Sequence, residues 1–144
     1  MHKIAIINGP NLNLLGKREP SLYGEQAFEP FLEELRRRYA GTAEITCFQS
    51  NHEGDLIDRI QADGFRSDGI ILNAGGYTHT SIALRDAVSA VPAPVAEVHL
   101  TDINTREPFR RLSYLTDVCC ITVMGKGLQG YEEALRHLIR LPKL

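Results

Sequence analysis

The sequence has no excess of charge of either sign. Its 144 residues include 16 lysines and arginines and 18 aspartates and glutamates, so the formal net charge is −2. Nucleic acids and anionic membranes bind strongly basic surfaces, which excludes a general electrostatic attraction to either partner. An anionic ligand must therefore be bound by a few cations that the fold brings together.

Long apolar runs and cysteines are also scarce. No apolar run could span a bilayer, and the run that follows Lys3, residues 4–7, ends at Asn8, before it could form the core of a signal peptide. The three cysteines, two of them adjacent at 119 and 120, favour reduced thiols packed inside the protein over a disulfide framework. We therefore expect a cytoplasmic protein that binds neither membranes nor nucleic acids.

Repeats, low-complexity tracts and linkers are absent too, so a single domain over residues 1–144 is expected. Apolar runs of strand length occupy residues 3–8, 43–48, 69–73, 95–100 and 118–124. Between them, apolar residues follow the helical period around residues 28–39, 56–60, 82–88 and 131–138. This alternation predicts an α/β fold with a doubly wound, five-stranded parallel sheet, in which ligands bind beyond the carboxyl ends of the strands.

The connection after the first strand, residues 8–24, is much longer than a strand-to-helix turn needs. Gly16 and Gly24 could serve as hinges. Between them lie Arg18 and Tyr23, a cation and a titratable phenol that a closing loop could place on a ligand. The sequence predicts a mobile lid at about residues 16–24, and the alternative is a solvent-exposed loop without function.

Small and polar residues follow the third strand at Asn73, Gly75, Gly76 and His79. The two glycines would let a ligand approach the backbone, and the next helix would offer free N–H groups to an anion. His79 could bind a hydroxyl or a carboxylate of that ligand. It could equally be a solvent-exposed residue at the start of the helix.

The fourth strand contains an acid and an imidazole at Glu97 and His99, two residues apart. Their side chains should leave the same face of a buried strand, where a carboxylate could hold a catalytic histidine in one tautomer. The alternative is a structural pair in the core. Downstream, Arg106 and Arg110 would share one face if their segment is helical, either as ligand-binding cations or as an exposed basic surface.

Several other motifs carry little weight. Residues 125–130 match the dinucleotide-binding fingerprint, but they follow the last expected strand and no ribose-binding acid comes about 20 residues later, so we expect a tight turn. The phosphate-binding loop and the nucleophile elbow are both missing from the sequence. A metal site could be assembled from His79, Glu97, His99 and Asp102, but no ligand spacing favours it.

Taken in order, eight segments of the sequence resemble the type II dehydroquinases, the 3-dehydroquinate dehydratases of the second type. Each segment is weak evidence alone, but eight in order along nearly the whole chain are specific. The segments are Asn8-Gly-Pro-Asn-Leu-Asn-Leu-Leu-Gly16, Arg18-Glu-Pro with Tyr23-Gly24, Gln49-Ser-Asn with Glu53-Gly54, Asn73-Ala-Gly-Gly with Thr78-His-Thr-Ser81, Leu84-Arg-Asp86, Glu97-Val-His99, Arg106-Glu with Phe109-Arg110, and Gly130-Tyr131.

The resemblance implies a flavodoxin-like fold, a homododecamer, and the dehydration of 3-dehydroquinate to 3-dehydroshikimate through an enolate, without cofactor or metal. It implies that Tyr23 is the base, acting as a phenolate with Arg18 beside it. Asn11 would orient a water that stabilises the enolate, and His99, oriented by Glu97, would be the acid. The reaction is common to aromatic amino acid biosynthesis through the shikimate pathway and to quinate breakdown.

The resemblance also implies how the substrate is bound. Asn73 and His79 would contact its polar groups, Leu100 and Thr101 its carboxylate, and Arg110 a ring hydroxyl. Arg106 would support the Tyr23 anion, and Asp86 would reach the site of a neighbouring subunit. The family commonly reads Ile-Ser-Asn after the histidine, whereas this chain reads Leu100-Thr101-Asp102, and we expect the charge of Asp102 to weaken substrate affinity modestly.

Three alternatives to this enzyme remain open at the sequence level. One is a metal-dependent hydrolase or lyase that uses His79, Glu97 and His99. Another is a flavodoxin-like module that binds a nucleotide or flavin at residues 125–130. A third is a dehydratase that forms a Schiff base, although none of the lysines lies in an apolar, pocket-like context. The lysines are Lys3, Lys17, Lys126 and Lys143.

Overall fold

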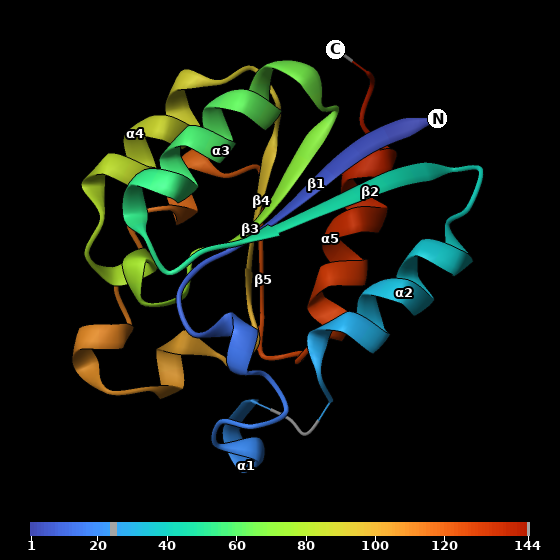
Figure 1. Cartoon of the computed structure of the whole chain (residues 1–144). Helices are drawn as coiled ribbons and strands as arrows, with labels where there is room; N and C mark the ends of the chain where they lie inside the picture. Colours follow the sequence, from blue (N-terminus) through green and yellow to red (C-terminus); the bar gives the residue numbers. More distant parts are fainter. Residues whose placement is uncertain (24–25, 144) are drawn as a thin grey trace.

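The computed structural model describes residues 1–23 and 26–143 (Figure 1). Within them, five strands form one parallel sheet in the order β2-β1-β3-β4-β5. The strands are β1 (His2–Asn8), β2 (Ala43–Gln49), β3 (Gly69–Asn73), β4 (Val95–His99) and β5 (Ile121–Met124). The helices are α1 (Pro20–Tyr23), α2 (Phe28–Arg38), α3 (Glu53–Arg66), α4 (Ile82–Ala90) and α5 (Gln129–Ile139). The predicted α/β fold with a five-stranded parallel sheet is confirmed.

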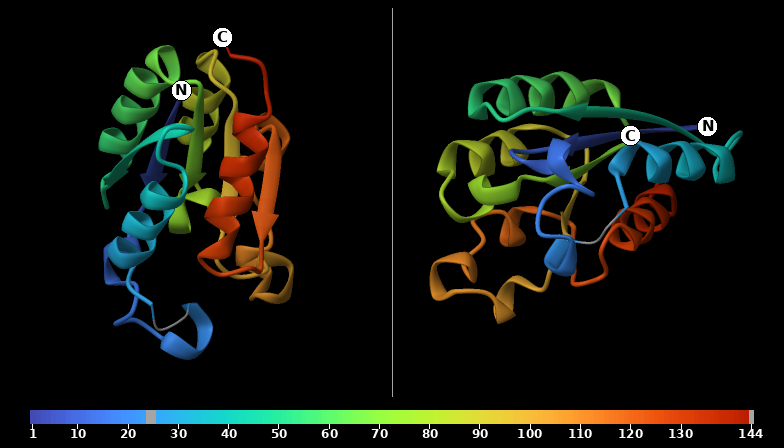
Figure 2. Two further views of the ribbon diagram at one scale, coloured as in Figure 1. Left: turned by 90° about the vertical axis from the view of Figure 1, so that its right-hand side faces the viewer. Right: turned by 60° about the horizontal axis from the view of Figure 1, so that its bottom comes forward.

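Helices cover both faces of the sheet, with α3 and α4 on one side and α2 and α5 on the other (Figure 2). As a result, alternate side chains of strand β1 pack into two different hydrophobic cores, one on each face of the sheet. Ile4 and Ile6 pack with α2 and α5, whereas Ala5 and Ile7 pack with α3 and α4. Burial on both faces explains why the central strands read as unbroken apolar runs.

The last strand is shorter than its apolar run. It begins at Ile121, and residues Thr116–Val118 form a 3-10 turn before it. Cys119 is half-buried, but Cys120 is exposed, so the expectation that both thiols are packed inside was wrong for Cys120. Because β5 is an edge strand, the segment that leads into it is covered on one side only.

The loops that follow β1 and β3 lie against each other at the carboxyl edge of the sheet. A side chain at Gly9 would place its Cβ 2.4 Å from the carbonyl oxygen of Ala74, so only glycine fits there. Gly75 adopts a φ of 59°, in the left-handed region, and its Cβ position faces Pro10. This close approach forms one side of the functional site. Within the described residues, no helix combines the length and the apolar character that crossing a membrane requires.

Candidate active site

A pocket of about 210 Å³ opens beyond the carboxyl ends of β1, β3 and β4. Of the expected site residues, Glu97 and Asp86 do not line it, and all the others do. Those that line it are Asn11, Arg18, Tyr23, Asn73, Gly75, Gly76, His79, His99, Leu100, Thr101, Arg106 and Arg110. The residues that directly follow the strands therefore converge on one cavity, as a doubly wound sheet predicts.

Glu97 and His99 form a buried pair at the end of β4. Glu97 is fully buried and His99 is 6% exposed. His99 Nε2 lies 2.5 Å from Glu97 Oε2. Burial acts to raise the pKa of Glu97, but hydrogen bonds from His99, Ser113 and Thr116 outweigh it and hold the pKa at about 2. Glu97 is therefore a carboxylate at neutral pH and can only accept, so His99 Nε2 must be the donor.

His79 stands on the opposite side of the pocket, in the 3-10 helix Gly75–His79 rather than at the start of α4. Its Nδ1 lies 2.7 Å from the carbonyl oxygen of Leu112. A carbonyl only accepts, so Nδ1 carries the proton of the neutral ring and Nε2 is free to accept from a ligand. Burial lowers the pKa of His79, and the charges of Arg106 and Arg110 lower it further, against the hydrogen bond to Leu112. His79 is therefore neutral at physiological pH.

Tyr23 ends helix α1 and is half-buried between two guanidinium groups. Arg106 Nη2 donates to the Tyr23 hydroxyl over 3.3 Å. The Arg18 guanidinium carbon lies 4.6 Å from the centre of the Tyr23 ring. Arg106 Nη1 also donates to Thr101 Oγ1 over 3.2 Å. Two cationic side chains therefore flank Tyr23, one bonded to its hydroxyl and one over its ring.

The arginines after β4 are positioned by two short turns rather than by one helix. Arg106 follows the 3-10 turn Ile103–Thr105, and Arg110 ends the turn Pro108–Arg110. The helical spacing considered for them is therefore wrong, although both side chains reach the pocket. Arg110 forms an ion pair with Glu107, with 2.9 Å between Nε and Oε2, which keeps its guanidinium at the pocket wall.

The loop after β1 is held by the end of β2. Asn11 has a φ of 70°, a left-handed conformation that asparagine tolerates. Its backbone N–H donates to Asn51 Oδ1 over 3.0 Å, and Gln49 Nε2 donates to the carbonyl oxygen of Gly9 over 3.1 Å. These bonds fix the backbone of Asn11 and leave its side chain at the pocket.

Comparison with known proteins identifies the family. The sequence matches the family model described as Dehydroquinase class II over residues 2–139. A protein of Exiguobacterium sp. named 3-dehydroquinate dehydratase is 52% identical over 137 residues, which cover 95% of this chain and 94% of that protein. The chain belongs to the class II dehydroquinase family.

Two further comparisons show how far the likeness extends. An Aspergillus flavus protein named Catabolic 3-dehydroquinase 2 is 47% identical over 142 residues, 96% of this chain and 93% of that protein. The crystal structure of type II dehydroquinase from Butyrivibrio crossotus has a TM-score of 0.91 to this structure at 44% sequence identity. It covers 95% of this chain and 97% of that chain. The flavodoxin-like fold that the resemblance implied is thus shared with a type II dehydroquinase.

Some residues that shape this dehydroquinase site were missed by sequence reasoning. Asn73 Nδ2 donates to the hydroxyl of Tyr131 over 3.0 Å, and this hydroxyl donates to Asn8 Oδ1 over 2.7 Å. Asn73 Oδ1 accepts from the N–H of Gly75. The amide of Asn73 is therefore held in one orientation at the pocket wall. The apolar stripe of α5 predicted that Tyr131 is buried but carried no signal for its polar partners.

Asp86 and Asp102 lie away from the pocket wall. Asp86 is exposed on α4 and is not among the residues that line the pocket. Asp102 Oδ1 accepts from the N–H of Asn104 over 3.0 Å and so caps the turn that follows. The carboxylate of Asp102 is thus bound within its own turn, whereas the sequence led us to expect that its charge acts on a bound substrate.

The structure also bears on the alternatives. Residues 125–128 form a turn in which the N–H of Gly127 donates to the carbonyl oxygen of Leu100, and residues 129 and 130 begin α5. None of these residues lines the pocket. No lysine lines the pocket either. In the described part of the chain, no three side chains of His, Cys, Asp or Glu gather where they could hold a metal ion. These observations lend no support to the three alternatives, which were a nucleotide-binding module, a Schiff-base dehydratase and a metal-dependent enzyme.

Proposed function

We propose that this chain dehydrates 3-dehydroquinate to 3-dehydroshikimate, without cofactor or metal. The observation that carries the proposal is one pocket in which a phenol between two cations faces a histidine bound to a buried carboxylate. Relatives that cover nearly the whole chain bear the name of this activity. Elimination of water beside a ketone needs a base, an acid and a stabiliser for the enolate, and the pocket wall offers a residue for each.

Tyr23 is the proposed base. As a phenolate it takes a proton from the carbon next to the ketone, and the electron pair moves onto the ketone oxygen to form an enolate. Arg106 donates to the Tyr23 hydroxyl and Arg18 lies over its ring, so both place positive charge beside the group that takes the proton. Asn11 orients a water toward the enolate oxygen, which stabilises its charge by a preorganised dipole.

His99 is the proposed acid. Its Nδ1–H donates the proton to the departing hydroxyl, which leaves as water while the enolate collapses to the conjugated ketone. The ring then carries a proton only on Nε2, which donates to Glu97. Tyr23 then releases to solvent the proton that it took, and His99 takes up a proton on Nδ1, so that the next cycle begins with both groups in their initial state.

Substrate binding is assigned to the polar groups that surround these two residues. Asn73 and His79 bind substrate hydroxyls, His79 through its unprotonated Nε2. Leu100 and Thr101 bind the carboxylate, and Arg110 binds a ring hydroxyl. Gly76 supports this assignment, because a Cβ at that position would meet only open space and the ligand can therefore approach the backbone.

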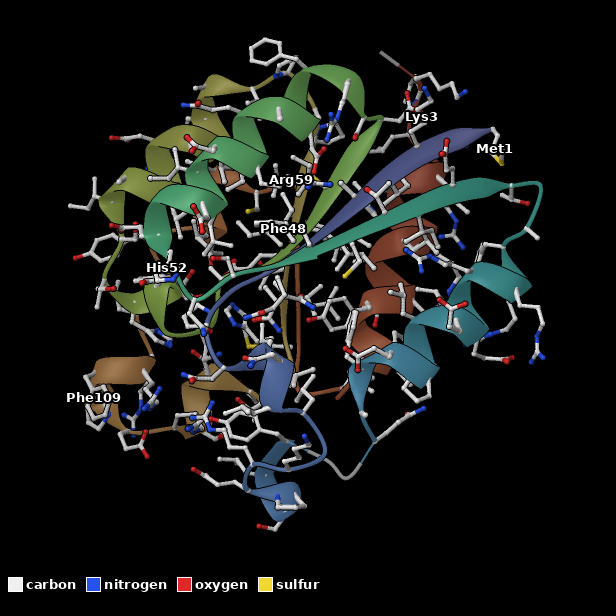
Figure 3. The ribbon with its side chains drawn as sticks, in the orientation of Figure 1. Met1, Lys3, Phe48, His52, Arg59 and Phe109 are labelled. Carbon is white, nitrogen blue, oxygen red and sulfur yellow. The ribbon has the colours of Figure 1, made fainter. Side chains whose placement is uncertain are left out.

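A lid and a neighbouring subunit complete the proposed enzyme. The lid comprises residues 16–24, of which Gly24 lies outside the described residues. Asp86 reaches the site of a neighbouring subunit in a homododecamer, which works in the cytoplasm. Exposed apolar side chains support an assembly, since Ile82, on the same helix as Asp86, is 57% exposed and Phe109 is 67% exposed. Figure 3 shows Phe109 pointing outward from the segment that also carries Arg110.

The test is a direct assay of the purified protein. Mixed with 3-dehydroquinate, it should generate the ultraviolet absorbance of a conjugated ketone, and a chelator should leave the rate unchanged. Borohydride added with substrate should not inactivate it, because no imine forms. Absence of product would refute the proposal, and loss of activity with the chelator would favour the metal-dependent alternative.

A further inference from the structure

Three hydroxyl groups surround the buried carboxylate of Glu97. Ser113 Oγ donates to Oε2 over 2.6 Å, and Thr116 Oγ1 and Thr122 Oγ1 donate to Oε1 over 2.8 and 2.9 Å. They come from three places in the chain: the segment after the Arg110 turn, the turn Thr116–Val118, and strand β5. None of them touches the pocket. We call them the hydroxyl cage.

The hydroxyl cage and His99 together use the whole acceptor capacity of the carboxylate. An ionised carboxylate offers about four acceptor positions, and Glu97 receives four donors, two on each oxygen. A protonated Glu97 would have to donate one bond and could no longer accept all four. The arrangement therefore favours the ionised form, and the ionised form requires a proton on His99 Nε2.

The other ring nitrogen is the one available for chemistry. His99 lines the pocket, and within the described residues its Nδ1 has no hydrogen-bond partner. With Nε2 committed to Glu97, Nδ1 is the only ring atom that can give a proton to a bound molecule. If the neutral ring changed tautomer, its proton would move from Nε2 to Nδ1. The carboxylate that binds Nε2 therefore controls which proton His99 can transfer.

We propose that Ser113, Thr116 and Thr122 are positioning residues of the reaction, whose hydroxyls keep Glu97 ionised and thereby hold His99 with Nε2 protonated and Nδ1 facing the substrate. The inference rests on the proposed dehydratase function. These residues do not touch the substrate and act through Glu97 alone.

The electrostatic balance at Glu97 supports this role. Burial is the largest influence on its pKa and acts upward, so the hydrogen bonds are what bring the pKa down to about 2. Removing the donors on Oε1 should shift this balance toward burial and raise the pKa of Glu97. A protonated Glu97 would then donate to Nε2 and force the neutral ring into the Nδ1–H tautomer, with no counter-ion for a charged ring.

Other titratable groups around the pair are few and already engaged. His79, Arg106 and Arg110 line the same pocket as His99. On the side of Glu97, burial and the Glu97 charge raise the pKa of the Cys119 thiol, which stays neutral. Asp117 is bound by Arg85 from α4. None of these groups replaces the hydroxyls as donors to Glu97.

The test uses threonine variants that separate the hydroxyl from the shape of the side chain. Thr116→Val and Thr122→Val, singly and together, remove the hydroxyl and keep the volume, whereas Thr116→Ser and Thr122→Ser keep the hydroxyl. Thr46→Val on β2, which lies outside the site, is the matched control. The readouts are kcat for 3-dehydroquinate as a function of pH and the 15N chemical shifts of the His99 ring.

In the double valine variant, activity should be lost on the acid side at a pH higher than in the wild type by about one unit or more. The sign follows from Glu97, since a raised pKa leaves it protonated as the pH falls. The serine variants and Thr46→Val should keep the wild-type profile. If the double variant does not fold, Thr122→Val alone should give a smaller shift in the same direction.

An unchanged pH profile in a folded valine variant would overturn the inference. Equal shifts in the serine and valine variants would also overturn it, because the methyl group and not the hydroxyl would then matter. The 15N spectra distinguish this failure from that of the proposed function. If the wild type forms no product, a change from Nε2–H to Nδ1–H in the valine variant still supports the positioning role, and an unchanged tautomer refutes it.

Discussion

The two sides of the pocket are built in different ways. The side of His99 belongs to the sheet, where His99 is 6% exposed and Glu97 fully buried with four donors around it. The side of Tyr23 belongs to helix α1, a single turn with no buried residue. The proposed acid is therefore held by the core, and the proposed base is delivered by a surface segment.

Because the two sides differ in burial, they should contribute differently to the stability of the protein and to its activity. A buried group that loses its partners costs free energy of unfolding, because its desolvation is no longer compensated. Tyr23 instead has one hydrogen bond of 3.3 Å and two cations near its ring. Glu19, at the start of this segment, has a φ of 37°, a strained left-handed conformation for a residue other than glycine. Changes on the base side should therefore alter the reaction alone, and changes on the acid side should alter both.

The largest expected effect is that of Tyr23→Phe. Removing the proposed base should lower kcat by about 10²- to 10⁴-fold, the usual contribution of general base catalysis. The melting temperature should not change, because the lost hydroxyl is half-exposed and weakly bonded. Measuring kcat and thermal unfolding on the same sample tests both the expected loss of activity and the expected unchanged stability. Full activity of this variant would rule out Tyr23 as the base.

Glu97→Ala should lower both the stability of the protein and its activity. The change leaves three hydroxyls and His99 without their acceptor in a buried site, so unfolding should become easier by about 3–5 kcal/mol. Catalysis should fall as well, because His99 loses the group that orients it. Urea unfolding and the assay check the two effects. The control is Glu44→Ala, at an exposed position on β2. A Glu97→Ala variant as stable as the wild type would show that Glu97 does not stabilise its side of the pocket.

The stability of the acid side should also depend on pH. The pKa of Glu97 is about 2 in the folded protein, below its ordinary value of 4.5, so the folded state binds protons less readily than the unfolded chain. Its stabilising effect, about 3 kcal/mol, is fully present above pH 4.5 and disappears as the pH falls toward 2. Unfolding measured from pH 6 to pH 2.5 should show this loss in the wild type. Glu97→Gln should lack that part of the dependence.

Arg106→Lys sharpens the comparison on the base side. The guanidinium donates to both Tyr23 and Thr101, a geometry that the single ammonium of lysine cannot reproduce. We expect kcat/KM to fall about tenfold, with the charge retained and the stability unchanged. Arg140→Lys, at an exposed position after α5 and outside the pocket, is the matched control. Equal activity of both variants would mean that positive charge alone is needed at position 106.

The smallest effect is expected for Asp102→Asn. The sequence predicted that the charge of Asp102 weakens substrate affinity, so that removing it should lower KM. In the structure this carboxylate caps its own turn, and an asparagine side chain can cap in the same way. We therefore expect KM to change by less than about twofold. A clear decrease of KM would restore the first interpretation.

Much of the site was predictable because residues near each other in sequence report local geometry. A spacing of two in a strand places Glu97 and His99 on one face, and both the pair and its hydrogen bond follow from it. The position of Asn73 and His79 after a buried strand placed them at the carboxyl edge of the sheet in the same way. The length of the loop after the first strand drew attention to Arg18 and Tyr23, and the family resemblance added the role of Tyr23 as the base and the residue Asn11.

Contacts between distant segments were not predictable by the same reasoning. Thr122 looked like one polar residue in an apolar strand, and Thr116 and Ser113 like loop residues, until the fold brought all three onto Glu97. Arg106 meets Tyr23 across 83 residues of chain. Such contacts depend on where loops are placed in space, which no local pattern records.

The sequence by itself determined the α/β fold, the order of strands and helices along the chain and the edge of the sheet at which the chemistry gathers. The physical reason is that period and burial are local properties, and that parallel strands align their carboxyl ends. The packing of the folded chain was needed to show which nitrogen of His99 is bound to Glu97 and which three hydroxyls surround that carboxylate. Hydrogen bonds act over about 3 Å, so their partners are selected by the final packing of segments rather than by the order of residues.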